Sequence, residues 1–261
     1  MSELVRYESR PPAVLLTIDR PDKRNALSRE LIATLTARFQ QAKTDPAARC
    51  VILTGAGTTF CAGMDLAELR ESIETKTAAN DVWDDVLPLA KLYDLIYTLP
   101  KPTIAAVNGA AVAGGAGLVT VCDLAISVSE AKFGYPEVRR GLVAAMVMPH
   151  LLRHVGERLA RYLLLTGELI DGPDAQRCGL INEVVPADRL LPRAFELAKS
   201  LAEGGPQALA ATKSLLQQFS RQALSIEEAA KASAAPRLSN ECRSGLAAFF
   251  EKIPAPWLSE R

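Results

Sequence analysis

One carboxylate and two glycine-rich loops are the parts of this sequence best suited to chemistry. The first loop spans residues 108–117 and contains Gly114 and Gly117, and the acid Glu137 follows on a later segment. Glycines let a ligand approach the main chain closely, and N–H groups at the start of a helix attract developing negative charge. Backbone donors with a single placed acid favour enolate or oxyanion chemistry on a carbonyl group.

A second loop, over residues 55–65, makes this donor site two-sided. The segments before the loops, residues 50–54 and 102–107, are short and apolar, which predicts a buried strand in front of each loop. Residues 118–122 then predict a buried helix after the first loop. Two loops of this kind that face one another can each supply one N–H group, which is the geometry of an oxyanion hole.

The rest of the chain predicts an α/β protein. Residues 4–9 and 13–19 predict a hairpin, and Ser28 is a good N-cap for a helix that extends to about Lys43. Strands and helices then alternate, which is typical of a layered α/β core. After Pro186 the pattern is helical, with helices predicted over residues 188–203, 206–219, 225–238 and 241–252. We therefore expect a core over residues 1–200 and a helical region over residues 201–261.

Composition excludes several classes of partner. The 261 residues are 49% apolar and carry 30 basic and 30 acidic side chains, so no excess of positive charge points to nucleic acid or to a membrane surface. The acidic start Met1-Ser2-Glu3 is not followed by an apolar run, and the five cysteines are scattered. We expect a cytoplasmic protein with reduced thiols.

Two weaker patterns suggest other functions. His150 and His154 have the spacing of one face of a helix, but no third ligand is evident, so we expect no metal site. Residues 55–60 nearly match a dinucleotide-binding loop, but they lack the third glycine and the later acid. An NAD-dependent oxidoreductase is therefore a weak alternative.

A series of short motifs resembles the enoyl-CoA hydratase/isomerase (crotonase) superfamily across the whole chain. They lie in the expected order at residues 20–27, 60–65, 101–109, 122–126, 133–137, 167–171 and 179–186. The resemblance implies a crotonase-like spiral of β-β-α units that binds acyl-CoA. It also implies a C-terminal helical region that forms a homotrimer or homohexamer. Coenzyme A would be part of the substrate, and no cofactor would be bound permanently.

The resemblance also assigns roles to residues. The N–H groups of Met64 and Gly114 correspond to the oxyanion hole, and the two catalytic glutamates of the family correspond to Gly117 and Glu137, so one acid is missing. Residues 141–148 are bulkier and more apolar than is usual there, which implies an altered acyl pocket. The residues expected to contact coenzyme A or the substrate are Lys23, Arg24, Ala26, Ala62, Asp65, Leu66, Gly115 and Gly117.

Three functions remain open. Glu137 alone can add water to an enoyl-CoA, or it can move a proton within a 3-enoyl-CoA to give the 2-enoyl isomer, which needs one base. The third is acyl-CoA binding with little turnover. Glu68 or Asp84 are candidates for a replacement second acid, and if the scaffold merely lacks that acid, Gly117→Glu should raise hydration. Burial in an apolar pocket should raise the pKa of Glu137.

Overall fold

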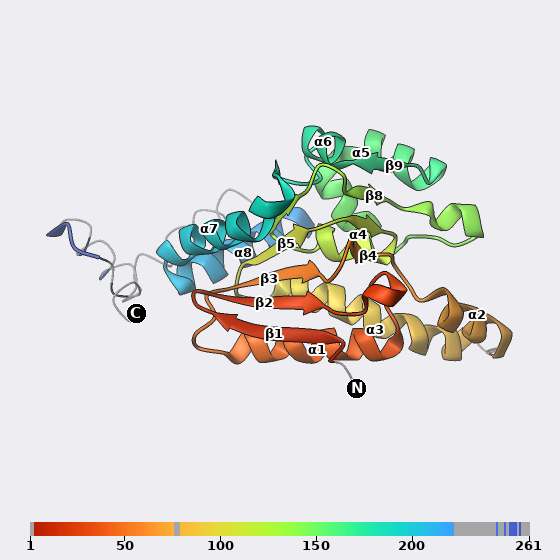
Figure 1. The fold of residues 1–261 in the computed structure, drawn as a ribbon, viewed down its shortest axis with the longest axis horizontal. Coiled ribbons are helices and arrows are strands. Elements are labelled where there is room, and N and C mark those ends of the chain that lie inside the picture. Colours follow the sequence, from red (N-terminus) through yellow and green to blue (C-terminus); the bar gives the residue numbers. More distant parts are fainter. Residues whose placement is uncertain are drawn as a thin grey trace.

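The computed structural model describes residues 3–75, 79–221, 244, 248, 251–254 and 256, which form two sheets surrounded by helices (Figure 1). The larger sheet has the order β1-β2-β3-β5-β7-β10 and the smaller sheet the order β4-β6-β8-β9. The strands of the larger sheet are β1 (Val5–Arg10), β2 (Ala13–Ile18), β3 (Cys50–Gly55), β5 (Thr103–Val107), β7 (Leu124–Ser127) and β10 (Glu183–Val184). Those of the smaller sheet are β4 (Thr59–Cys61), β6 (Ala110–Val112), β8 (Lys132–Gly134) and β9 (Leu169–Asp171).

The chain passes repeatedly from the larger sheet to the smaller sheet and then to a helix. Strands β3, β5 and β7 pair in parallel, and each is followed by a short strand, β4, β6 or β8, that pairs in the smaller sheet. Only β1 is antiparallel to its neighbour in the larger sheet, as the predicted hairpin requires. This repeat of strand, strand and helix confirms the expected α/β spiral of β-β-α units.

The short strands were not expected from the sequence. The glycine-rich loops were predicted to run directly from a buried strand into a helix, but β4 and β6 lie within them. Each of these strands has three residues, which is too short for an alternating apolar pattern to be recognised. These two strands matter for the site. Because β4 and β6 pair in parallel, the segments that follow them lie at the same end of the smaller sheet.

The helices confirm most of the predicted segments. Ser28 caps α1 by accepting a hydrogen bond from the N–H of Leu31, as predicted, and the apolar face of α1 is buried. The described helices are α1 (Arg29–Thr44), α2 (Leu66–Thr75), α3 (Ala79–Thr98), α4 (Gly114–Thr120), α5 (Met148–Thr166), α6 (Gly172–Arg177), α7 (Leu190–Glu203) and α8 (Pro206–Arg221). The helices predicted over residues 225–238 and 241–252 lie outside the described residues, single positions excepted.

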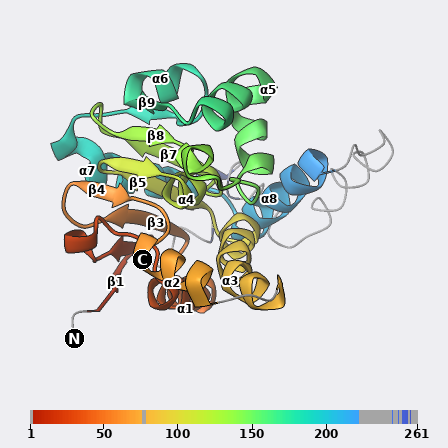
Figure 2. The same ribbon diagram turned by 90° about the vertical axis from the view of Figure 1, so that its right-hand side faces the viewer.

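The helices cover the sheets on different sides. Helix α7 packs against β2, β3, β5 and β7, whereas α1 packs against β1 and α3. The short helix α4 contacts β4, β5 and β6 and therefore lies where the two sheets approach one another. Figure 2 shows α8 beside α3, at the edge of the layered core.

An ion pair between a buried lysine and a more exposed aspartate fastens α8 to the core. Lys213 is 7% exposed, and its Nζ lies 2.6 Å from Oδ2 of Asp123. The same carboxylate oxygen accepts a hydrogen bond from the N–H of Thr103 at the start of β5. Asp123 therefore links β5, β7 and α8.

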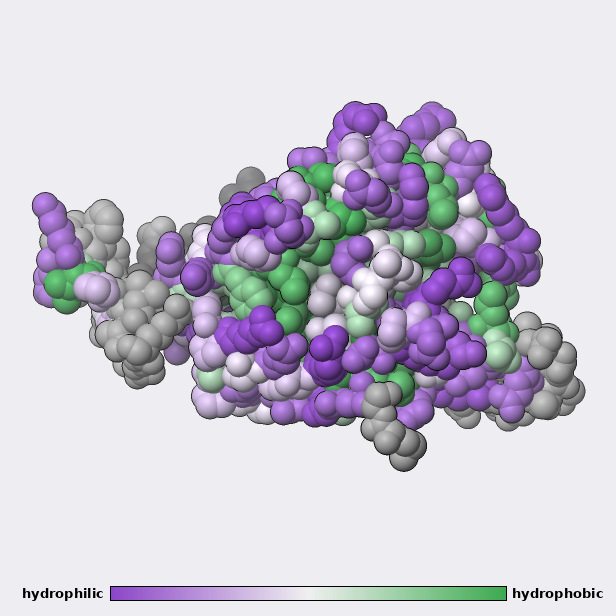
Figure 3. Space-filling model, in the orientation of Figure 1, coloured by the Kyte–Doolittle hydropathy of each residue, from purple (hydrophilic) through white to green (hydrophobic). Residues whose placement is uncertain are grey.

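Apolar side chains reach the surface in the upper part of the molecule. Figure 3 shows hydrophobic residues among α5, α6 and β9, where Leu165 is 69% exposed and Leu169 is 46% exposed. In the described part of the chain, no helix combines the length and the apolar character that crossing a bilayer requires.

Candidate active site

Two backbone segments meet where β4 and β6 end. The segment after β4 contains Gly63, whose φ is +90°, and the segment after β6 leads into α4 at Gly114. A Cβ atom added to Gly63 would lie 2.9 Å from the carbonyl oxygen of Val112 and 3.3 Å from the nitrogen of Gly114. Only glycine allows this approach, because any side chain would strain the backbone and push the segments apart.

Each segment leaves one N–H group open. The N–H of Leu27 donates to the carbonyl of Gly63, and the N–H of Asp65 donates to the carbonyl of Leu27, so this bridge leaves the N–H of Met64 unused. Gly114 is the first residue of α4, where N–H groups have no partner within the helix. No acceptor for either N–H is found among the described residues. The structure thus brings the two predicted donors together.

Ala113, immediately before Gly114, has a strained backbone. Its φ of 52° and ψ of −122° are rarely adopted by a residue with a side chain. Such strain costs on the order of 1–3 kcal/mol and is concentrated at functional sites. The hydrogen bond from the N–H of Ala113 to the carbonyl of Gly134 holds this conformation. The strained residue fixes the direction of the Gly114 N–H group.

A cavity of about 240 Å³ opens beside these donors. It is bounded by α2, α3, the start of α4 and the 3₁₀ helix η2 (Pro136–Arg140). Its wall is mostly apolar, and among its lining residues only Tyr93, Glu137 and Arg140 have polar side-chain groups. The lining residues are Ala62, Met64, Leu66, Leu69, Val86, Leu89, Tyr93, Val112, Ala113, Gly114, Pro136, Glu137, Arg140, Leu142, Val143, Ala144, Met146 and Val147.

Glu137 is the acid of this cavity. Its Oε2 atom is buried and has no hydrogen-bond partner in the described part of the protein. Burial raises the pKa of Glu137 above its ordinary value, and the nearby charge of Arg140 acts in the opposite direction. A half-buried carboxyl group with a raised pKa is suited to taking up and releasing a proton.

The space beside Gly117 is already filled. A Cβ atom at this position would lie 2.5 Å from the Oη of Tyr93 and 2.6 Å from a methyl carbon of Val147. A glutamate at position 117 would therefore require both side chains to move, so the prediction that Gly117→Glu raises hydration depends on a rearrangement of Tyr93 and Val147. In this structure Tyr93 and Val147 occupy the space into which a side chain at position 117 would extend.

The other predicted site residues divide into two groups. Ala62 and Leu66 line the cavity as expected, and the apolar segment at residues 141–148 forms much of its wall. Gly115 does not reach the cavity, because a Cβ atom there would lie 2.1 Å from the carbonyl oxygen of Cys61. Gly115, like Gly117, permits close packing of α4 and has no place in the cavity wall.

The charged residues that were predicted to contact coenzyme A or the substrate are not among the residues that line the cavity. Lys23 and Arg24 are exposed, in the same turn as Ala26. The carbonyl of Arg24 accepts a hydrogen bond from the N–H of Ala62, which places this turn beside the cavity wall. Asp65 pairs with Arg20 at 2.7 Å and caps α2 through the N–H of Ala67. Asp65 therefore supports the loop.

Glu68, one of the two candidates for a replacement acid, is not among the described residues that line the cavity. An oxygen of Glu68 accepts a hydrogen bond from the N–H of Arg29, so this side chain turns toward α1. The side chain of Asp84 lies outside the described residues. Among the residues that line the cavity, Glu137 is the only carboxylate.

Sequence reasoning did not identify Tyr93 and Arg140 as part of the site. Tyr93 lies on α3 among apolar residues that resemble an ordinary buried helix face, and Arg140 follows Glu137 on η2. Only the packing of α3 against α4 brings Tyr93 to the glycines. A hydroxyl group within an apolar face was the one available signal.

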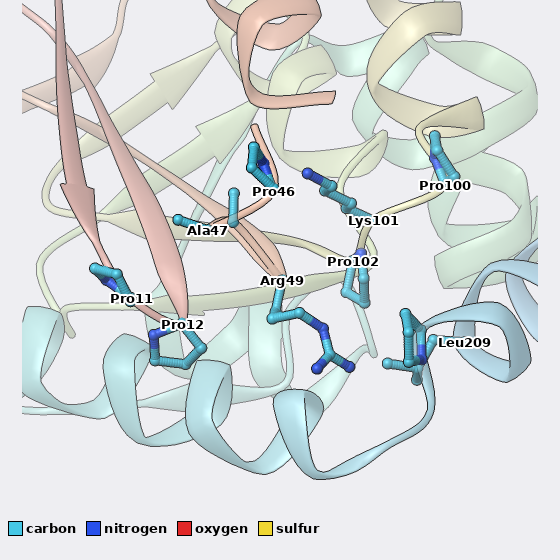
Figure 4. A pocket seen from close by; sticks show the side chains of 11 residues that line it. Pro11, Pro12, Pro46, Ala47, Arg49, Pro100, Lys101, Pro102 and Leu209 are labelled. Carbon is cyan, nitrogen blue, oxygen red and sulfur yellow. The ribbon is translucent and has the colours of Figure 1, made fainter. Parts of the chain in front are cut away.

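A larger cavity, of about 660 Å³, lies elsewhere in the molecule and is rich in proline (Figure 4). Its lining residues include no carboxylate. The Nζ of Lys101 donates to the carbonyls of Ala42 and Asp45, and Arg49 donates to the carbonyl of Gly204. These cations fasten loops together, so this cavity lacks the acid and the open donors of the smaller one.

The structure also tests the alternatives to carbonyl chemistry. The loop after β3 leads into β4, so residues 55–60 lack the strand-loop-helix arrangement of a dinucleotide site. His150 packs edge-on against Tyr97, and the ring of His154 contacts the carbonyl of Thr120. No group of three metal-binding side chains occurs in the described residues.

Comparisons with known proteins agree with this geometry. Residues 12–260 match the model of the enoyl-CoA hydratase/isomerase family. A provisionally named enoyl-CoA hydratase of Thermus thermophilus is 42% identical over 96% of this chain and 99% of its own length. The 2,3-dehydroadipyl-CoA hydratase of Escherichia coli is 34% identical over 97% of both chains. The crystal structure of an enoyl-CoA hydratase from Shewanella pealeana superposes with a TM-score of 0.92 at 30% identity, covering 97% of this chain and 96% of that one.

Proposed function

Because the chain belongs to the enoyl-CoA hydratase/isomerase family, we propose that it adds water to a 2-enoyl-CoA thioester with Glu137 as its single acid-base group. The observation that carries this proposal is one half-buried carboxyl group in an apolar cavity beside two unused N–H groups. A thioester carbonyl oxygen at the N–H groups of Met64 and Gly114 places the reacting carbons in that cavity.

The two N–H groups would stabilise the charge that develops during the reaction. When oxygen adds to the β-carbon, the electrons of the double bond move to the thioester oxygen and give an enolate. Fixed donors cost no reorganisation at that moment, and the loss of one such donor typically costs about 3 kcal/mol of transition-state stabilisation. The strain at Ala113 and the close approach of Gly63 support this role, because both fix the donors in advance.

Glu137 would move one proton between two positions. Its carboxylate takes a proton from water as the water oxygen bonds to the β-carbon, and it then gives that proton to the α-carbon as the enolate collapses. Both transfers occur on one face, so the addition is syn. The raised pKa of Glu137 suits this task, because the group must be a base in the first transfer and an acid in the second.

Isomerisation of a 3-enoyl-CoA is the second candidate, and the same observation favours it. Moving a double bond needs one base and an enolate site, which this cavity has without a second acid. The apolar wall formed by residues 142–147 supports an acyl substrate in both cases. Acyl-CoA binding with little turnover is the remaining alternative.

We also propose how the rest of the substrate and the assembly are held. Lys23 and Arg24 are exposed beside the loop of Ala62 and can meet the phosphates of coenzyme A, with Ala26 along the pantetheine path. Exposed Leu216 and Phe219 on α8 support a role of the C-terminal region in a homotrimer or homohexamer. No permanently bound cofactor is required by this mechanism.

Mass spectrometry and absorbance on crotonyl-CoA and 3-hexenoyl-CoA test the function. A hydratase adds one water to crotonyl-CoA, whereas an isomerase converts the 3-enoyl substrate into a conjugated product without added water. Glu137→Gln should abolish either reaction while a saturated acyl-CoA still binds. Normal turnover by Glu137→Gln would exclude the assignment of the acid, and binding without turnover in the unmodified protein would favour the third alternative.

A further inference from the structure

Tyr93 is the second polar group that is buried in the wall of the candidate active site. It lies on α3, is 2% exposed, and lines the same cavity as Glu137 and Gly114. Its Oη lies 2.5 Å from the position that a Cβ atom on Gly117 would take. The tyrosine hydroxyl is therefore held beside the first turn of α4, in the space that a longer side chain at position 117 would enter.

The hydroxyl group of Tyr93 uses its proton in one hydrogen bond and keeps lone pairs that can accept others. Tyr93 donates its single proton to the carbonyl of Gly114 at 2.7 Å. Burial, with the nearby Cys61, Tyr135 and Glu137, holds the pKa of Tyr93 well above its ordinary value, so the proton stays on the oxygen. A hydroxyl group has one donor and two acceptor lone pairs. Because its proton is already used, the Tyr93 oxygen can take part in a further hydrogen bond only as an acceptor.

The proposed reaction needs an acceptor of this kind. A water molecule that attacks the β-carbon must direct a lone pair at that carbon, and it has two protons to place. Glu137 accepts one of them. If the second proton has no acceptor in an apolar cavity, the water loses a hydrogen bond on entry and is free to rotate. Among the described residues that line the cavity, Arg140 offers donors only, so Tyr93 is the remaining side chain there with open lone pairs.

We propose that Tyr93 orients the attacking water by accepting its second proton in a hydrogen bond, while Glu137 removes the first. This role rests on the proposed hydration reaction and assigns its second polar partner. Tyr93 gains and loses no proton in the reaction. The water oxygen bonds to the β-carbon, Glu137 carries one water proton to the α-carbon, and the other proton remains on the product hydroxyl, where Tyr93 still accepts from it.

The substitution Tyr93→Phe tests this role, because the ring and its packing remain. We expect kcat for hydration of crotonyl-CoA to fall about ten-fold, with little change in KM, from the loss of one hydrogen bond. Tyr97→Phe is the matched control. It removes the same atom from the same helix, but Tyr97 pairs with Ser220 outside the cavity, so its kcat should stay within about two-fold of the original.

A second reaction separates this role from one that acts through Gly114 alone. Exchange of the α-proton of butyryl-CoA with D₂O needs Glu137 and the oxyanion donors but no attacking water. We expect Tyr93→Phe to slow this exchange much less than it slows hydration. Equal loss of both reactions would mean that Tyr93 merely positions Gly114, and it would overturn the proposal.

Incorporation of 3-fluorotyrosine at position 93 tests whether Tyr93 acts as an acceptor for water or only as a donor to Gly114, and it keeps the hydrogen bond to Gly114. Fluorine makes the hydroxyl a better donor and a weaker acceptor while the ring keeps nearly the same shape. An acceptor role predicts slower hydration, whereas a role limited to donation to Gly114 predicts an equal or faster rate. Should the protein hydrate no enoyl-CoA, the proposed function fails and the role of Tyr93 with it. Hydration that is unchanged in both variants refutes the role of Tyr93 alone.

Discussion

The substitution Gly117→Ala adds a single methyl group to the most crowded glycine of the candidate active site. The new Cβ would lie 2.5 Å from the Oη of Tyr93, 2.7 Å from its Cζ and 2.6 Å from a methyl carbon of Val147. Contacts this short require the neighbours to move. Because Tyr93 is buried and hydrogen-bonded to Gly114, we expect the tyrosine to shift and this bond to break.

The expected cost follows from three effects. Replacing glycine by alanine within a helix such as α4 favours the folded state by about 1 kcal/mol. Forcing an additional carbon into a packed interior costs about 1–3 kcal/mol. Leaving the buried hydroxyl of Tyr93 without its acceptor costs about 1–3 kcal/mol more. The free energy of unfolding should therefore fall by about 3 kcal/mol, which is large for a single methyl group.

Urea unfolding and hydration kinetics measure the two consequences. Gly117→Ala should lower both stability and kcat, and Val147→Ala introduced with it should restore about 1 kcal/mol by removing one of the short contacts. Gly156→Ala is the control. No atom lies within 4 Å of a Cβ there, but φ is 70° and ψ is 170°, so about 1–3 kcal/mol should be lost through backbone strain with activity unchanged. If Gly117→Ala is as stable and as active as the original protein, the packing argument is refuted.

Two further predictions concern charged groups. Burial raises the pKa of Glu137 above 4.5, so the folded state binds this proton more tightly than the unfolded state, and stability declines as pH rises from about 4.5 through the raised value. Glu137→Gln should consequently stabilise the protein more at neutral pH than at about pH 4. Urea unfolding at the two pH values measures this difference. An equal change in the free energy of unfolding at both pH values would contradict the raised pKa. Lys213→Met removes the partner of Asp123, which stays in contact with solvent and keeps its hydrogen bond from Thr103, so the change should cost about 1–2 kcal/mol of unfolding free energy. The exposed pair of Arg161 and Glu157 provides the control, since Arg161→Met should cost less than about 0.5 kcal/mol in the same assay.

The sequence predicted those elements whose signals are local. Residues 50–54 and 102–107 are apolar runs with clear boundaries, and they form β3 and β5. Ser28 carries its own capping group, so the start of α1 could be assigned from one residue. The short strand β6 could not be predicted, because its three residues form a strand only through their pairing with β4 and β8.

The site, too, contains residues with a local sequence signal and residues whose role depends on tertiary packing. Glu137 and Gly114 were predicted because acids and glycine-rich loops have recognisable chemistry in a sequence. The contribution of Tyr93 depends on the packing of α3 against α4, which are separated along the chain by β5 and β6. Gly115 and Gly117 were assigned to ligand contact, but their short distances to Cys61 and Tyr93 depend on a three-dimensional arrangement that no local pattern encodes.

Gly117, Tyr93 and Val147 behave as one packed unit, and this governs how the site could be converted to two acids. A glutamate at position 117 requires the space of both neighbours, so restoring a second carboxylate requires at least two further substitutions. Removing Tyr93 to make that space would also release the carbonyl of Gly114, whose own N–H group is one of the proposed oxyanion donors. A second acid at position 117 would therefore disturb the geometry of the proposed oxyanion donors. The proposed reaction, with Glu137 as its single acid-base group, leaves this packing and its donors undisturbed.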